Sequence, residues 1–148
     1  KLTRKQMFTI KLIIKERIRY KYIRLLKVKK GNIMEYHIEE RKDVIIIYCQ
    51  ERLDINSSWS LEEEVMEKID KNFKYFVFEL TNTQYISSSG IRVIVSTHNK
   101  LKSRGGALYL ANPSDSVRVI LKLVELEGIL NIVDSLETAL NAINEKRK

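Results

Sequence analysis

Cysteine, histidine, proline and glycine are all scarce in this 148-residue chain, and each scarcity excludes a class of protein. The single cysteine, Cys49, excludes an internal disulfide and any metal site built from several cysteines. Two histidines, His37 and His98, argue against a histidine-rich metal site. One proline and five glycines exclude collagen-like and linker-rich chains. No run of about 18 apolar residues occurs, so no membrane-spanning segment is predicted.

Basic residues outnumber acidic ones, but the excess is confined to one end of the chain. Residues 1–33 hold twelve Lys/Arg and one Asp/Glu, whereas residues 34–148 hold fifteen and eighteen. The net charge of +8 therefore divides into +11 on a basic N-terminal extension and −3 on the rest. A basic chain suggests nucleic acid or an anionic membrane as a partner. Because residues 34–148 are mildly acidic, we expect no direct contact with nucleic acid.

The extension, residues 1–33, alternates basic and apolar residues. Its apolar residues at helical spacing are Ile10, Ile13, Ile14, Ile18, Tyr22, Leu25 and Leu26. An amphipathic basic helix could lie on anionic lipid or in a groove of a partner protein. An ordinary extra helix and a disordered tail are the plainer alternatives. A further alternative is that Met34 is the natural start, because the codons of Lys30 and Gly31 can form a ribosome-binding sequence. Membrane contact is expected only if the extension is genuine.

Residues 34–148 predict a single α/β domain. Strands are predicted over residues 34–40, 44–49, 75–80, 107–110 and 129–133 from period-two or β-branched apolar patterns. Four helices are predicted between them and after the last strand. Strands that alternate with helices imply a mixed, mostly parallel sheet of about five strands. The first two strands are expected to form a hairpin.

Several helix ends can be predicted from capping residues. Asp54 and the run from Asn56 to Ser58 offer caps for the first helix, with Ser58 and Glu62 close to a capping box. Trp59 is expected to pack on that helix. Ser88 or Ser89 is the expected cap of the second helix, which ends at 104–106. The third helix is expected to open at 112–114 and to end at Gly128, and Asp134 or Ser135 is expected to cap the fourth.

The segment most able to carry chemistry is Ser87-Ser88-Ser89-Gly90, where a strand and loop lead into a helix. The first turn of a helix has unpaired N–H groups and the positive end of the dipole. A hydroxyl there is either a plain cap or a position able to carry an anionic group. Gly90 permits the close approach of a partner. Both interpretations remain open from the residues alone.

Enzymatic interpretations lack the residues that they require. Neither Gly-x-Ser-x-Gly nor a Walker-type phosphate loop occurs. His98 falls on the apolar side of a predicted helix, which favours a core histidine over a catalytic base. Cys49 lies in an apolar strand and is expected to be buried and inert. Asn82 and Glu79 have no evident partners for a metal, so no cofactor, metal or catalytic residue is predicted.

Residues 34–148 resemble the STAS domain, and in particular bacterial anti-sigma factor antagonists. The resemblance rests on Glu51–Asp54, on the strand Phe76–Thr81, on the entry of Tyr85–Ile91 into a helix, and on the later segments 101–108, 111–121 and 126–129. Ser-Ser-Gly and Asn-Pro-Ser at the right separation are fairly specific together, whereas either alone would be weak. The extension has no counterpart in this resemblance.

The resemblance implies a cytoplasmic binding protein rather than an enzyme. An anti-sigma factor that is also a serine kinase would bind ATP and phosphorylate Ser89, with Ser88 as the alternative acceptor. The unphosphorylated chain would bind this anti-sigma factor and free the sigma factor, the phosphorylated chain would let go, and a serine phosphatase would reset it. The residues implied in partner binding are Asp54, Asn82, Ser87, Ser88, Ser89, Gly90, Ile91 and Arg92.

Two positions depart from the family pattern, which usually has Asp at the positions of Ser87 and Glu79. Glu79 keeps the charge, but Ser87 removes an acid next to the acceptor serine. The alternative is therefore a STAS module of another regulatory or membrane-associated complex, such as a lipid transport or sensory assembly. In that case the serines would serve only as caps or contacts.

Overall fold

The computed structural model describes residues 3–11 and 36–148. The chain divides into two units, Lys1–Met34 and Glu35–Lys148. In the first unit, residues 4–11 are helical, and Thr3 and Gln6 cap each other's backbone N–H groups at 2.9 and 3.2 Å. The rest of the helical stripe predicted for the extension lies outside the described residues. None of the helices described is both long and apolar enough to span a membrane.

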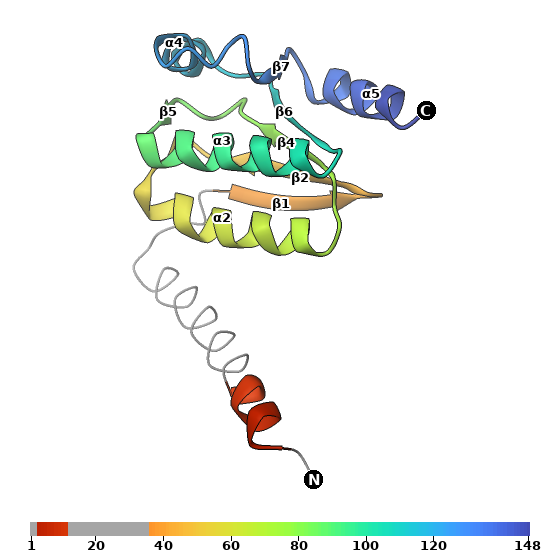
Figure 1. Cartoon of the computed structure of the whole chain (residues 1–148). Helices are drawn as coiled ribbons and strands as arrows, with labels where there is room; N and C mark the ends of the chain where they lie inside the picture. Colours follow the sequence, from red (N-terminus) through yellow and green to blue (C-terminus); the bar gives the residue numbers. More distant parts are fainter. Residues whose placement is uncertain (1–2, 12–35) are drawn as a thin grey trace. The chain divides into compact units, whose positions relative to one another are not determined.

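The second unit is an α/β domain built on a five-stranded sheet (Figure 1). Its strands are β1 (Tyr36–Arg41), β2 (Val44–Cys49), β4 (Tyr75–Glu79), β6 (Ala107–Ala111) and β7 (Asn131–Val133), in that spatial order. β1 pairs antiparallel with β2, and the remaining pairs are parallel. The predicted hairpin and mostly parallel sheet are therefore confirmed.

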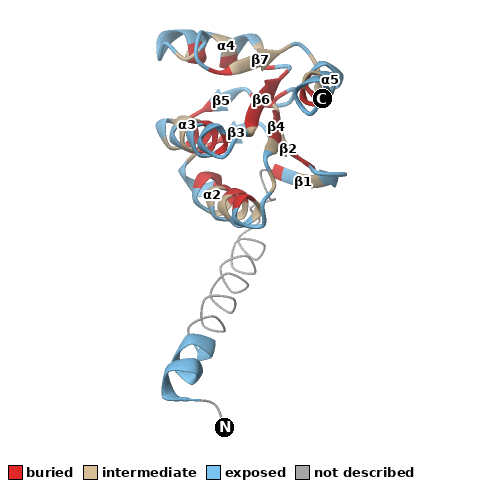
Figure 2. Ribbon diagram, turned by 45° about the vertical axis from the view of Figure 1, so that its right-hand side comes forward, coloured by how far each residue is buried: buried red, intermediate tan, exposed pale blue. Residues whose placement is uncertain are grey.

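Four helices of this unit cover the sheet: α2 (Ile55–Asp70), α3 (Ser88–Ser103), α4 (Asp115–Leu123) and α5 (Leu136–Lys146). The core splits at the sheet into two clusters. Residues of α2, α3 and α4 join the cluster that contains Ile47 and Phe78, whereas α5 joins the cluster that contains Ile46 and Val77. The central strands are thus buried on both faces, as their continuous apolar sequence predicts (Figure 2).

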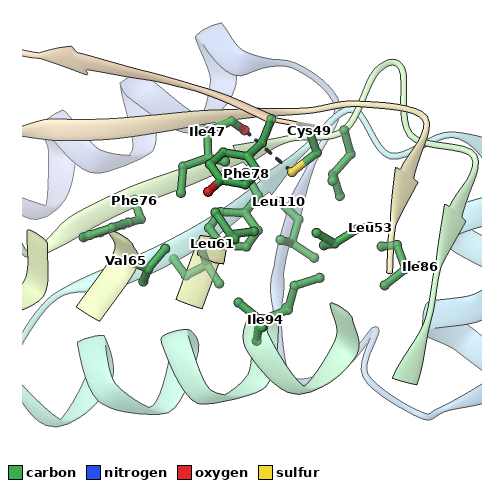
Figure 3. Close-up of a cluster of buried hydrophobic side chains, with 14 of the residues drawn as sticks. Ile47, Cys49, Leu53, Leu61, Val65, Phe76, Phe78, Ile86, Ile94 and Leu110 are labelled. Carbon is green, nitrogen blue, oxygen red and sulfur yellow. Dashed lines mark hydrogen bonds between the residues drawn. The ribbon is translucent and has the colours of Figure 1, made fainter. Parts of the chain in front are cut away.

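The larger cluster surrounds Phe76 and Phe78 of β4, with side chains from α2, α3 and β2 packed around them (Figure 3). Cys49 lies in this cluster, with its Sγ 3.9 Å from the carbonyl oxygen of Ile47. Burial raises the pKa of Cys49 to about 12, and the Glu79 carboxylate adds to the shift. Cys49 is therefore buried, as predicted, and its lack of reactivity stays a prediction.

The helix ends confirm one expected cap and correct two others. Of the caps offered for α2, Asp54 is the one used, and it exchanges hydrogen bonds with Ser57, whereas the capping box of Ser58 and Glu62 is not formed. α3 is capped by Ser87, not by Ser88 or Ser89. α4 ends at Leu123 rather than at Gly128, because Glu125 turns the chain with a φ of 60°. At the starts of α2 and α3 several suitable caps lie within one turn, and the contacts of the folded chain select among them.

Candidate functional site

The candidate site lies at the sheet edge where β2, β4 and β6 end. The three loops that follow these strands are hydrogen-bonded to one another. The Thr83 hydroxyl donates to the Gln50 carbonyl at 2.8 Å, and the Ser114 hydroxyl donates to the Thr83 carbonyl at 2.6 Å. Asn112 Nδ2 donates to Thr81 Oγ1 at 3.0 Å. Parallel strands commonly present binding sites at this edge, because their loops converge there.

A small second sheet, not predicted from the sequence, holds the start of α3. β3 (Arg52–Leu53) pairs in parallel with β5 (Tyr85–Ile86), and the Ser87 N–H donates to the Leu53 carbonyl at 2.9 Å. The Arg52 guanidinium stacks 4.5 Å from the centre of the Tyr85 ring. Two-residue strands have no recognisable periodicity, so only the long-range pairing reveals them.

Gly90 is required where α3 crosses β3. A Cβ at this position would lie 2.6 Å from the Leu53 carbonyl oxygen and 2.8 Å from Cγ2 of Ile86. Both distances are shorter than real Cβ contacts, so any side chain would push α3 away from β3. The buried glycine therefore fixes where the helix begins, which is a structural role in addition to the partner contact expected from the sequence.

The three serines occupy different environments at the start of α3. The Ser87 hydroxyl accepts a hydrogen bond from the Gly90 N–H at 3.3 Å, and Ser87 is half-buried. Ser88 is exposed and Ser89 is half-buried. No acid lies in the first turn of α3, whereas α4 and α5 begin with Asp115 and Glu137. The positive end of the α3 dipole thus lacks the anion that usually stabilises such a position.

Arg92 lies one turn beyond the serines and contacts the neighbouring helix. Its two terminal nitrogens pair with the two carboxylate oxygens of Glu62 at 2.9 and 2.8 Å. These hydrogen bonds raise the pKa of Arg92 above its usual range. Ile91 is half-buried and packs on the larger core cluster. Arg92 is thus exposed but held in place.

Asp54 and Asn82 differ in how closely the structure joins them to the serines. Asp54 follows Leu53, whose carbonyl binds Ser87, and its carboxylate caps α2 by accepting the Asn56 N–H at 2.9 Å. Asn82 is exposed in the turn after β4. The site residues expected from the sequence therefore gather around the starts of α2 and α3, with Asn82 at the preceding turn.

Exposed apolar side chains in the first half of α2 and in β5 were missed from the sequence. Ile55 is 73% exposed, Trp59 44% and Tyr85 41%. The expected packing of Trp59 was wrong, because the buried stripe of α2 runs through Leu61 and Val65 and leaves residue 59 outside it. Trp59 follows Ile55 by four residues and precedes Glu62 by three, so these three residues lie along one side of α2.

His98 shows no connection with the serines. It is 8% exposed on the buried side of α3, and its Nδ1 has no hydrogen-bond partner among the described residues. Burial lowers its pKa, and the charges of Lys102 and Lys146 lower it further. It is a core histidine, as predicted. Within the described ranges, no three His, Cys, Asp or Glu side chains gather as a metal site would require.

The STAS domain family matches residues 35–139, which include every element from β1 to the start of α5. The chain belongs to the STAS domain family. Two relatives match most of this STAS domain. A candidate anti-sigma factor antagonist of Thermotoga maritima is 26% identical over 70% of this chain and 93% of its own length. The anti-sigma F factor antagonist of Paenibacillus polymyxa is 23% identical over 76% and 94% respectively.

Solved structures share the fold of this STAS domain. The crystal structure of a candidate anti-sigma factor antagonist from Thermotoga maritima has a TM-score of 0.70 and 24% identity, covering 74% of this chain and 94% of that one. The phosphorylated form of SpoIIAA, a Bacillus cell fate determinant, has a TM-score of 0.62 and 17% identity, covering 73% and 98%. At these identities the structures show the common fold alone.

Proposed function

We propose that this STAS domain is an anti-sigma factor antagonist that acts through the start of α3. The unphosphorylated chain binds an anti-sigma factor that is also a serine kinase, and so frees the sigma factor. Phosphorylation of Ser89 ends this binding, and a serine phosphatase restores it. The single observation that carries the proposal is the Ser88-Ser89-Gly90 turn, presented at a helix start that Gly90 fixes against β3. The two curated relatives named as antagonists support it.

The switch requires a site that tolerates phosphate in the free protein. A phosphate carries about −1.5 to −2 charges and three acceptor oxygens. At the start of α3 it would meet the positive end of the dipole, where no acid is present. In a protein interface closed around Ser89, the same group would need desolvation. A loss of a few kcal/mol there changes the affinity by orders of magnitude.

The chain is proposed to be the substrate of the kinase and not an enzyme. The Ser89 hydroxyl attacks the γ-phosphorus of ATP bound to the kinase, the bond to ADP breaks, and the hydroxyl proton passes to the kinase or water. The phosphatase hydrolyses the ester with water and returns the hydroxyl and inorganic phosphate. This chemistry asks of the chain only an accessible hydroxyl, and we propose that it takes place in the cytoplasm.

A direct test uses the ATP-binding anti-sigma factors encoded in the genome that carries this gene, each purified and mixed with the chain. We expect one of them to form a complex with ADP and to add one phosphate with ATP, as measured by mass spectrometry. Ser89→Ala should abolish the mass gain, and Ser88→Ala should leave it. If Ser88→Ala alone abolishes it, the acceptor is Ser88.

A negatively charged substitution of Ser89 tests whether phosphorylation makes the chain release the anti-sigma factor. Ser89→Asp should weaken the complex more than tenfold in calorimetry. Ser116→Asp is the matched control, because Ser116 occupies the second position of α4 as Ser89 does in α3, and its side chain is exposed. Unchanged binding by Ser89→Asp would contradict the proposed switch.

The second candidate function is a STAS module of another regulatory or membrane-associated complex without a phospho-switch. Ser87 favours it, because a serine supplies the cap of α3 but not the acid usual in phosphorylated relatives. No mass gain with any of the kinases, together with flotation on phosphatidylglycerol vesicles that depends on residues 1–33, would support this alternative.

A further inference from the structure

The second turn of α3 and the middle of α2 are joined by the ion pair between Arg92 and Glu62. The two helices run side by side (Figure 1). A second ion pair joins their far ends, where Arg104 lies 3.6 Å from Asp70 and also donates to the Ile69 carbonyl at 3.0 Å. The helices are therefore joined at two places along their length, and of these two ion pairs only that of Arg92 lies one turn from the serines.

Arg92 follows Ser89 by three residues and Ser88 by four. Residues at these separations are neighbours on a helix surface, with Cβ atoms about 5–6 Å apart. The Arg92 side chain is 57% exposed, so it can change partner without disturbing the core. A phosphate on either serine would thus lie within reach of the same guanidinium that now binds Glu62.

The competition between the two anions favours the phosphate. Glu62 offers one negative charge, whereas a phosphoserine offers about −1.5 to −2 and three oxygens. The planar guanidinium binds phosphate bidentately as well as it binds a carboxylate. The start of α3 adds attraction for the phosphate but none for Glu62, which is the eighth of the sixteen residues of α2.

We propose that phosphorylation of Ser89 moves Arg92 from Glu62 to the phosphate, and so releases the ion pair between the second turn of α3 and the middle of α2. This inference rests on the proposed function, since it concerns the regulation of the same site. The modification would then act twice: it adds charge at α3, and it leaves the Glu62 carboxylate without its bidentate partner on α2.

Loss of the ion pair with Arg92 would change the charge along one side of α2. Ile55, Trp59 and Glu62 follow one another at a spacing of four and three residues, and the first two are exposed. Exposed tryptophan is typical of residues that dominate protein interfaces. A partner that binds the serines could therefore also sense the altered side of α2. Trp59 is the only tryptophan of the chain, so its fluorescence reports on this region.

The test installs phosphoserine at residue 89 during translation, which requires no kinase. The second pKa of the phosphate is then measured by phosphorus NMR. A cation in contact holds that pKa down, so Arg92→Gln should raise it by about 0.5 units. Arg92→Lys should give a smaller rise in this pKa, because lysine keeps the positive charge but lacks the planar guanidinium that binds two oxygens at once. Arg104→Gln is the matched control at the far tie and should leave the value unchanged.

Glu62→Gln separates an exchange of partners from simple charge effects. It should lower the phosphate pKa in the chain with Arg92, because nothing then competes for the guanidinium. In the Arg92→Gln background it should have little effect. Phosphorylation should also change the Trp59 emission, and Arg92→Gln should suppress that change.

The proposal is wrong if Arg92→Gln shifts the phosphate pKa no more than Arg104→Gln does. It is also wrong if Glu62→Gln has the same effect with and without Arg92. Neither result depends on a kinase or a partner. A chain that no kinase phosphorylates would therefore overturn the proposed function and leave this measurement intact.

Discussion

Arg92 on α3 forms a bidentate ion pair with Glu62 on α2, which lies thirty residues earlier in the chain. The pair joins the middle of α2 to the second turn of α3, one turn beyond Ser88 and Ser89. Its Glu62 side chain is 24% exposed and its Arg92 side chain 57%, so water screens the pair from the Arg92 side. The serines are thus presented on a helix that is held both by β3 and by α2.

The ion pair should make a measurable contribution to stability. We expect a double-mutant cycle of Arg92→Gln and Glu62→Gln to give a favourable coupling free energy in urea unfolding. The more exposed pair of Lys71 and Glu67 at the end of α2 is the control, and a smaller coupling is expected there. Equal couplings would show that the bidentate geometry adds nothing.

Gly90 should tolerate no side chain. Gly90→Ala should cost about 1–3 kcal/mol of unfolding free energy, because the new methyl group would meet the Leu53 carbonyl and Ile86. Gly128→Ala is the matched control, since no atom lies within 4 Å of the added carbon, and its effect should stay within about 0.5 kcal/mol. Urea unfolding measures both. A neutral Gly90→Ala would contradict the close crossing of α3 and β3.

Trp59 and Leu61 should respond differently to substitution, although they lie two residues apart. Leu61 is fully buried, so Leu61→Ala should cost about 2–5 kcal/mol. Trp59→Gln should cost less than about 1 kcal/mol, because residue 59 lies outside the buried stripe. Strong quenching of the tryptophan by acrylamide in the folded chain would agree with this. A large loss of stability in Trp59→Gln would restore the packing role expected from the sequence.

Cys49 should be unreactive in the folded chain. Its pKa of about 12 leaves almost no thiolate at pH 8, so iodoacetamide should modify it only after unfolding in urea. Because the folded pKa is raised, the contribution of the thiol to stability is complete below the unfolded pKa of about 8.5. That contribution is lost as the pH rises toward 12.

Urea unfolding at several pH values checks this prediction for Cys49. As the pH rises from about 8.5 toward 12, the unfolding free energy of Cys49→Ala should fall less than that of the unsubstituted chain. Rapid alkylation at pH 8 under native conditions would show that the thiol is accessible.

Much of the fold could be predicted because its signals are local. The continuous apolar run at 44–49 identifies a strand buried on both faces, and the 16 residues of α3 follow a clear helical stripe. The prediction failed where several nearby residues could serve the same purpose. Ser87, Ser88 and Ser89 are equally good caps by type, and the choice of Ser87 depends on its bond to Leu53.

By itself, the sequence determined the order of strands and helices, the division of charge between the extension and the domain, and the position of Ser-Ser-Gly at the start of a helix. These properties depend on residue type and on spacings within a few turns. Tertiary structure alone decided the β3–β5 pairing, the close crossing at Gly90, the tie between Arg92 and Glu62, and the exposure of Trp59. Each of these depends on which surfaces meet when segments thirty or more residues apart pack together, and such contacts leave no periodic signal in the chain.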